Sequence, residues 1–174
     1  TVPSLPTMQR IEVNQGTLQI NSDYAMANDS TFQAQVNGDG SHGQLKVNGT
    51  TTLDGALKVI RGPGAYVDGT TYGILTGDAV NGWFMGETLP KPTPLVSFLV
   101  NPPRDHVEIE AQVNSFTTVS NNPTQSKIAT YLDRILLTAT GDLAYVLGEI
   151  QLLSEPEEFS TAFSSLSPDS YDNY

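Results

Sequence analysis

The chain has 174 residues with eight Lys plus Arg, nineteen Asp plus Glu and no cysteine, so its formal net charge is −11. So few cations cannot neutralise a run of phosphates, which argues against nucleic-acid binding and against docking on anionic lipid. The lack of cysteine excludes disulfide scaffolds, thiol catalysis and thiolate metal sites. No apolar run approaches the ~20 residues of a membrane-spanning helix. The opening residues, Thr1 to Ser4, read like a cut through a longer protein.

A short phrase, a glycine followed by an apolar–polar–apolar segment, occurs at Gly16–Ile20, Gly43–Val47 and Gly55–Val59. Alternate side chains of a strand face opposite sides, so each copy predicts a short strand. Pairs such as Asn48-Gly49 and Asp54-Gly55 turn the chain sharply between strands. This density of turns favours the stacked coils of a β-solenoid. The unequal spacing of the copies, 27 and then 12 residues, is also typical of a sandwich.

Longer strands are predicted further along, at 70–76, 80–85, 95–100 and 106–113. The loop at 89–94 contains three prolines, which lack the N–H that a central strand donates. The last two strands, turned by Pro102-Pro103, are expected to form an antiparallel pair. Such a pair would cap the open end of a solenoid and prevent edge-to-edge association.

Aromatic residues gather in these later strands. Large rings supply burial where coils stop stacking, so we expect an aromatic folding cap. Its proposed members are Tyr72, Trp83, Phe84 and Phe98. The alternative is that Tyr72 and the Trp83–Met85 segment form a binding platform.

After residue 121 the hydrophobic period becomes helical. Asn122 is the predicted N-cap, Pro123 the first helical residue and Gln125 the capping-box partner. The predicted apolar stripe of this helix consists of Ile128, Tyr131, Leu132, Ile135, Leu136 and Ala139.

Two further helices are predicted. The second begins near Asp142, and its stripe is Leu143, Val146, Leu147 and Ile150. The third begins with a capping box of Ser154 and Glu157 and ends at Pro168, and its stripe is Phe159, Ala162, Phe163 and Leu166. All three helices need a partner surface, either within this chain or on a part outside it.

The residue types divide the chain into two parts. Residues 1–114 are rich in Gly, Asn, Thr and Val, and residues 115–174 have helical spacing. Their net charges are −5 and −6, so charge does not mark the boundary. The predicted fold is therefore mainly β, with a β domain at 1–114 followed by amphipathic helices at 115–174.

Motifs for catalysis or metal binding are weak. His42 and His106 lie in unrelated segments, and neither has a second ligand at metal spacing. The run Asp39–His42 places an acid, a hydroxyl and an imidazole together, but a triad needs groups converging from separate segments. Glu108 and Glu110 share one strand face, which we interpret as a solvent face rather than an acid/base pair. We therefore assign no catalytic, cofactor or metal residue and expect no enzyme.

Several phrases follow one another in a fixed order. A glycine–threonine phrase at 49–60 precedes a tyrosine-containing stretch at 64–77 and then Val80–Phe84, and later come 121–133 and Leu166–Tyr171. In this order they resemble the C-terminal passenger (autochaperone or junction) region of bacterial type V autotransporters, pertactin-like or adhesin-like, cut before the barrel. Two departures are Trp83, beside the family's usual Phe, and the length of the proline-rich loop.

The resemblance implies a right-handed parallel β-helix end with an antiparallel cap, followed by an α-helical linker segment. It implies a non-catalytic passenger segment that nucleates folding of the secreted β-helix and leads to its own C-terminal β-barrel translocator. The implied location is the cell surface or the medium of a Gram-negative bacterium, reached through the periplasm and outer membrane. A chain without cysteine suits that unfolded passage. The alternatives are an adhesin that contacts a host surface receptor and a fragment of a polysaccharide-acting β-helix enzyme.

Overall fold

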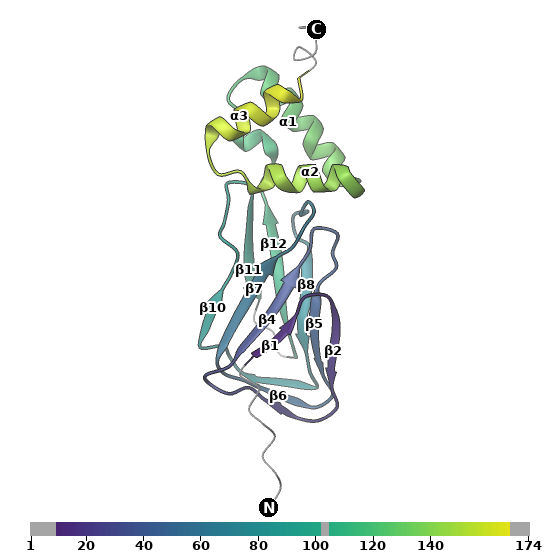
Figure 1. The fold of residues 1–174 in the computed structure, drawn as a ribbon, viewed down its shortest axis with the longest axis vertical. Coiled ribbons are helices and arrows are strands. Elements are labelled where there is room, and N and C mark those ends of the chain that lie inside the picture. The colour runs from purple at the N-terminus through teal and green to yellow at the C-terminus, as the bar shows by residue number, and fades with distance from the viewer. Residues whose placement is uncertain (1–9, 102–104, 168–174) are drawn as a thin grey trace, which may run out of the picture. The chain divides into compact units, whose positions relative to one another are not determined.

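The computed structural model describes residues 10–101 and 105–167. Its strands form three sheets (Figure 1). Sheet A contains, in spatial order and all parallel, β1 (Arg10–Val13), β4 (Thr31–Val36), β7 (Ala56–Arg61) and β10 (Gly86–Thr88). Sheet B contains, in spatial order, β2 (Gly16–Ile20), β5 (Gly43–Val47), β8 (Thr71–Thr76), β12 (His106–Val113) and β11 (Val96–Asn101). Sheet C contains the parallel strands β3 (Tyr24–Ala25), β6 (Thr50–Leu53) and β9 (Ala79–Gly82).

Consecutive strands visit the three sheets in turn. From β1 to β9 the chain passes three times through sheets A, B and C, and β10 returns to sheet A. Strand β2 stacks on β5 in register, with Gly16 opposite Gly43, and Thr17 bonds Gln44 at an offset of 27 residues. The third glycine phrase lies in sheet A instead, where Ala56 pairs with Thr31. The unequal spacing of the phrases therefore arises because two of them share a sheet and the third does not.

The interior between the sheets is filled by columns of apolar side chains. In sheet A, Ile11, Phe32 and Leu57 are opposite one another on successive strands, and all three are buried. Alternation along each strand turns these side chains inward, as the sequence pattern predicts. Polar pairs follow the same stacking in the turns, where Asn48 Nδ2 donates to Asn21 Oδ1 at 2.7 Å. Parallel stacking thus buries apolar residues in columns and satisfies polar groups along the outside.

Sheet B changes direction after its third strand. Strand β12 runs antiparallel to β8, with a register shift between Val107 and Glu108, and β11 lies on the outer side of β12. The predicted turn at Pro102-Pro103 lies outside the described residues. The strand predicted for 80–85 is wrong in its second half, because β9 ends at Gly82. The chain leaves the sheet at Gly82, whose φ of +75° is not that of an extended strand. Only glycine fits there, because a Cβ would lie 2.5 Å from the Leu53 carbonyl oxygen.

The C-terminal part is helical. It contains a short 3₁₀ helix, η1 (Phe116–Val119), and the helices α1 (Pro123–Leu136), α2 (Gly141–Leu152) and α3 (Pro156–Ser165). The N-cap prediction for α1 is confirmed, since Asn122 Oδ1 accepts from the Gln125 N–H at 2.9 Å. The Gln125 side chain accepts from the N–H of Asn121 rather than that of Asn122. The box of α3 lies one residue later than predicted, because Glu158, not Glu157, accepts from the N–H groups of Ser154 and Glu155. The predicted end at Pro168 lies outside the described residues.

The predicted apolar stripes are confirmed in part, since Leu132, Leu147, Ile150, Phe159 and Phe163 are buried. In α1 the buried residues are Gln125, Ala129 and Leu132, and in α2 they are Leu147, Gly148, Ile150 and Gln151. Tyr131, Leu143 and Val146, predicted for the buried stripes, are exposed. In α2, Gly148 and Gln151 are buried because this helix packs on the segment 63–66. Gly148 lies against the Gly64 carbonyl, and Gln151 bonds the backbone of Tyr66.

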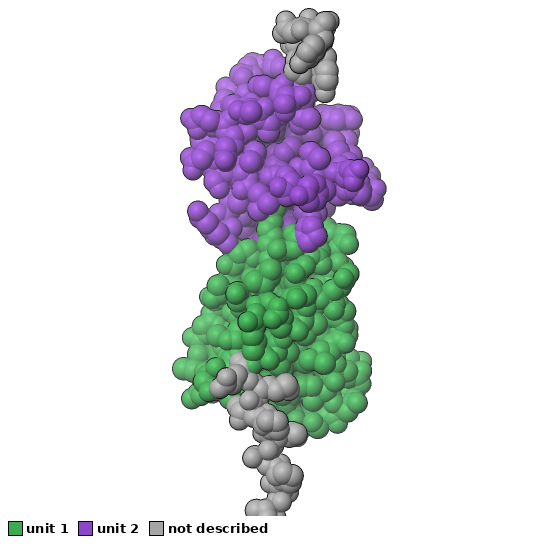
Figure 2. All heavy atoms as spheres, in the orientation of Figure 1, with its two compact units in different colours: residues 1–62, 71–90, 99–110 green, residues 63–70, 91–98, 111–174 purple. Residues whose placement is uncertain are grey.

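The chain divides into two compact units, coloured separately in Figure 2. Unit 1 comprises 1–62, 71–90 and 99–110, and unit 2 comprises 63–70, 91–98 and 111–174. Unit 2 therefore contains all three helices together with two segments from the first part of the chain. The sequence-based division at residue 114 stays a prediction. In the parts of the chain that the structure describes, no helix is long and apolar enough to cross a membrane.

Candidate functional site

Tyr72 lies on β8 and contacts the segment between β4 and β5. Its side chain is fully buried, and its hydroxyl donates to the Asn37 carbonyl oxygen at 2.9 Å. Its ring meets His42 edge-on, with the centroids 5.7 Å apart. The Gln44 side chain adds a second bond, from Nε2 to the Gly73 carbonyl oxygen at 2.9 Å. Tyr72 thus combines ring burial with a satisfied hydroxyl, as a buried tyrosine requires.

The other predicted cap aromatics lie in separate places. Trp83 and Phe84 contact each other in unit 1 with centroids 5.4 Å apart, and Trp83 Nε1 donates to Glu87 Oε1 at 2.7 Å. Phe98 belongs to unit 2, where it meets Tyr66 edge-on at 5.1 Å. The sequence reading did not single out Tyr66, although this fully buried ring lies in the tyrosine-containing stretch 64–77. The assignment of all four rings to one folding cap stays a prediction.

The two ends of the stack in unit 1 differ. Among the described strands, β1, β2 and β3 are the outer members of sheets A, B and C, so each presents an unpaired parallel edge. Leu18 of β2 is 42% exposed, whereas Leu45, its partner on β5, is 0% exposed. Beyond β8, sheet B continues instead into the antiparallel β12, whose Ile109 is fully buried. One end of this unit is therefore open to further stacking in all three sheets, and in sheet B the other end is closed.

The acid–hydroxyl–imidazole run in the turn after β4 does not form a triad. Ser41 donates its hydroxyl to Asp39 Oδ1 at 2.6 Å and its backbone N–H to the same oxygen at 2.9 Å. These two bonds, the hydroxyl bond first, hold the pKa of Asp39 below its ordinary value. The His42 Nδ1 atom lies 3.1 Å from the Gly40 carbonyl oxygen and its ring packs on Tyr72. The run is a hydrogen-bonded turn.

The carboxylates of β12 are held by different neighbours. His106, the first residue of β12, lies between Asp105, which precedes the strand, and Glu108, with Nδ1 2.5 Å from Asp105 Oδ1 and Nε2 3.3 Å from Glu108 Oε1. Glu110 instead accepts from Asn101 Nδ2 on β11 at 2.9 Å. Glu108 and Glu110 therefore have different partners in the structure. Among the described residues no cluster of three or more His, Asp or Glu has the geometry of a metal site.

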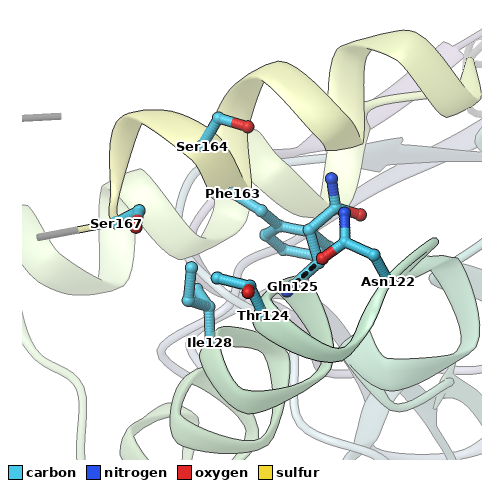
Figure 3. A pocket seen from close by; sticks show the side chains of 7 residues that line it. All are labelled: Asn122, Thr124, Gln125, Ile128, Phe163, Ser164 and Ser167. Carbon is cyan, nitrogen blue, oxygen red and sulfur yellow. Dashed lines mark hydrogen bonds between the residues drawn. The ribbon is translucent and has the colours of Figure 1, made fainter. Parts of the chain in front are cut away.

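A polar hollow of about 510 Å³ lies between the start of α1 and the end of α3 (Figure 3). It is lined by Asn122, Thr124, Gln125, Ile128, Phe163, Ser164 and Ser167. Two of its polar groups already have partners: Asn122 caps α1, and Gln125 bonds the N–H of Asn121 and the hydroxyl of Ser160. The hollow is thus formed around helix-capping groups, and we assign no ligand to it.

An apolar groove of about 420 Å³ lies between α1 and α2. Its lining residues are Lys127, Ile128, Tyr131, Leu132, Ile135, Leu143, Val146, Leu147, Ile150 and Leu166. Three of these, Leu132, Leu147 and Ile150, are buried. The groove was not predicted from sequence. Four of its lining residues are exposed, although the sequence predicted them as members of the apolar helix stripes: Tyr131, Leu143, Val146 and Leu166.

Comparison with known proteins adds no relative. The sequence matches no protein-family model and no curated protein.

Proposed function

We propose that this chain is the closing end of an exported right-handed parallel β-helix, as in the C-terminal passenger region of type V autotransporters. In this proposal it is not an enzyme and binds no cofactor. It nucleates the folding of coils that precede it and connects them, through α1 to α3, to a C-terminal β-barrel translocator. Its location is the surface or the surroundings of a Gram-negative bacterium.

The main support is the difference between the two ends of unit 1. A solenoid grows by nearest-neighbour stacking, in which each coil is a template for the next. Strands β1, β2 and β3 present three parallel edges at once, and Leu18 continues the buried column of Leu45 and Leu75. A preceding coil would pair with these edges and cover Leu18. The right hand is supported by the strong preference of parallel crossovers for that hand.

Further support comes from the end that β12 closes. An antiparallel strand interrupts the parallel template in sheet B, so further coils cannot pair with β8 in parallel register. Tyr72 and Gln44 bond this closing layer to the coil before it. An end that is closed in sheet B can fold first and then serve as the template from which the remaining coils extend.

The two alternatives have less support. An adhesin that contacts a host receptor through Tyr72 and the Trp83–Met85 segment would expose these residues. Met85 is 73% exposed, but the rings of Tyr72 and Phe84 are buried. A polysaccharide-acting enzyme needs carboxylates that converge on a substrate. Glu12 is instead held by Arg10 and Gln33, and the carboxylates of β12 have separate neighbours.

A folding experiment with two matched substitutions tests the proposal. Ile109 in the closing strand β12 and Ile11 in the edge strand β1 are both buried isoleucines. An Ile-to-Val change at either position costs about 1 kcal/mol of stability. Folding and unfolding rates are measured by stopped-flow fluorescence of Trp83, the single tryptophan.

If the closing end is the nucleus, I109V slows folding by up to about fivefold, while I11V leaves the folding rate nearly unchanged and accelerates unfolding by about fivefold. The opposite pattern, with I11V slowing folding and I109V accelerating unfolding, contradicts the proposal. Equal effects of the two substitutions on the folding rate also contradict it, because a polarised nucleus requires them to differ.

A further inference from the structure

The groove between α1 and α2 exposes large apolar side chains next to one another. Leu132, Leu147 and Ile150 are buried in its floor, while Tyr131 and Val146 remain 60% and 46% exposed on its two sides. A contiguous apolar patch of this kind marks an interaction surface in soluble proteins, whereas single exposed residues do not. The charges beside the groove indicate what it binds.

Each side of the groove carries the same arrangement of residues with opposite charge. On α1, Lys127, Tyr131 and Arg134 are spaced i, i+4, i+7, so they lie on one stripe. On α2, Asp142, Val146 and Glu149 have the same spacing. We call these stripes the basic rim and the acidic rim.

The basic rim is positively charged, although it belongs to an acidic part of the chain. Lys127 and Arg134 are the two cations of residues 115–174, a region that also contains eight carboxylates. All four charged side chains of the rims are exposed. The ion pairs within the described residues involve Arg10 and His106 and none of these four side chains. Both rims are thus available to groups outside this chain.

We propose that two copies of this chain pair through the groove about a two-fold axis. Residues 137–140 connect the end of α1 to the start of α2, and the two helices are oblique to each other in Figure 1. Arg134 and Asp142 therefore lie near this connection, whereas Lys127 and Glu149 lie away from it. A two-fold axis that runs along the groove between the helices places the basic rim of one copy beside the acidic rim of the other. Lys127 then faces Glu149 of the second copy, Arg134 faces Asp142, and Tyr131 packs on Val146.

A second copy fits the groove better than a partner of one charge. A partner with a single sign of charge would satisfy one rim and be repelled by the other, whereas a two-fold pair satisfies both in an isologous contact. The net charge of −11 on each copy opposes association only at longer range. That repulsion is screened beyond about 8 Å at physiological salt, but charges in contact across the rims are screened less.

Charge reversal at the rims tests this pairing by sedimentation velocity over a concentration series. The wild-type chain is expected to show a monomer–dimer equilibrium. The basic-rim variant K127E/R134E and the acidic-rim variant D142K/E149K each lose four rim contacts per dimer and gain repulsion, so each dimerises at least about tenfold more weakly. An equimolar mixture of the two variants is expected to form a heterodimer, because every facing pair is then again of opposite charge.

The control is K46E/K58E, which changes the net charge as K127E/R134E does but reverses exposed lysines on β5 and β7. It should dimerise as the wild type does, and circular dichroism checks that each variant is folded. A wild-type chain that stays monomeric throughout the series overturns the proposal and leaves the groove to another occupant. A mixture of the two rim variants that does not associate, or a control that loses dimerisation equally, also overturns it.

Discussion

Replacing Gln151 by leucine tests how the helices are held in unit 2. Gln151 is fully buried on α2, and its side-chain amide makes two hydrogen bonds with the backbone of Tyr66, 85 residues away. Oε1 accepts from the Tyr66 N–H, and Nε2 donates to the Tyr66 carbonyl oxygen, both at 2.8 Å. Leucine fills a similar volume but can neither accept nor donate a hydrogen bond.

The expected loss of stability follows from the groups left behind. A buried polar group without a partner costs about 1–3 kcal/mol. Q151L removes a partner from two backbone groups of Tyr66, and the apolar side chain recovers part of the loss through burial. We therefore expect a loss of about 2–4 kcal/mol in the free energy of unfolding.

Gln125 provides the matched control. It is also a buried helical glutamine of unit 2, but its partners are the N–H of the exposed Asn121 and the hydroxyl of the half-buried Ser160. Water can replace glutamine at such partners, so Q125L should cost only about 1 kcal/mol. Urea unfolding followed by far-UV circular dichroism measures both variants. If Q151L costs no more than Q125L, the reasoning about the Tyr66 contact is refuted.

Three further predictions concern single side chains. G148A should destabilise the protein by about 1–3 kcal/mol despite the better helix propensity of alanine, because the new Cβ would overlap the Gly64 carbonyl. Y72F should cost about 1 kcal/mol, since it removes one buried hydrogen bond without changing the packing of the ring. D39N should lower stability at neutral pH but not in acid. The bonds from Ser41 lower the pKa of Asp39 below 3.8, so its stabilisation is present above that value and is lost as the pH falls through the folded-state pKa.

Thermal and urea unfolding check all three. G86A is the control for G148A, because a Cβ at Gly86 meets no atom within 4 Å, and it should change stability by less than about 0.5 kcal/mol. A stabilising G148A would contradict the packing of α2 on Gly64. A Y72F variant as stable as the wild type would mean that its hydroxyl contributes nothing. For D39N, a stability difference from the wild type that persists unchanged below pH 3.8 would be contrary to expectation.

Local features of this protein were predictable because they depend on neighbouring residues. The bounds of β2, β5 and β12 agree with the strands predicted from alternation. Asn122 caps α1 as predicted, because its side chain accepts from the Gln125 N–H and Pro123 has no N–H that needs a partner. The alternation of β12 is also confirmed, since Val107, Ile109 and Ala111 are buried.

Features that depend on distant contacts were not predictable in this way. Alternation marks Gly16–Ile20 and the segment after Gly55 as equivalent strands. Only the pairing with other strands puts the first in sheet B and the second in sheet A. Helical periodicity could not tell that α2 buries Gly148 and Gln151, because these residues pack on Gly64 and Tyr66 from a different part of the chain.

The sequence by itself therefore located β2, β5, β12 and the three helices, through alternation, glycine and capping residues. The tertiary structure decided which copies of the glycine phrase stack, which ring each aromatic residue meets, and which helix faces stay exposed. The physical reason is that a side-chain pattern specifies an apolar face, whereas its partner is selected by complementarity of shape and hydrogen bonding. Tyr131 and Val146 show this difference, because they are apolar by pattern but exposed in the fold.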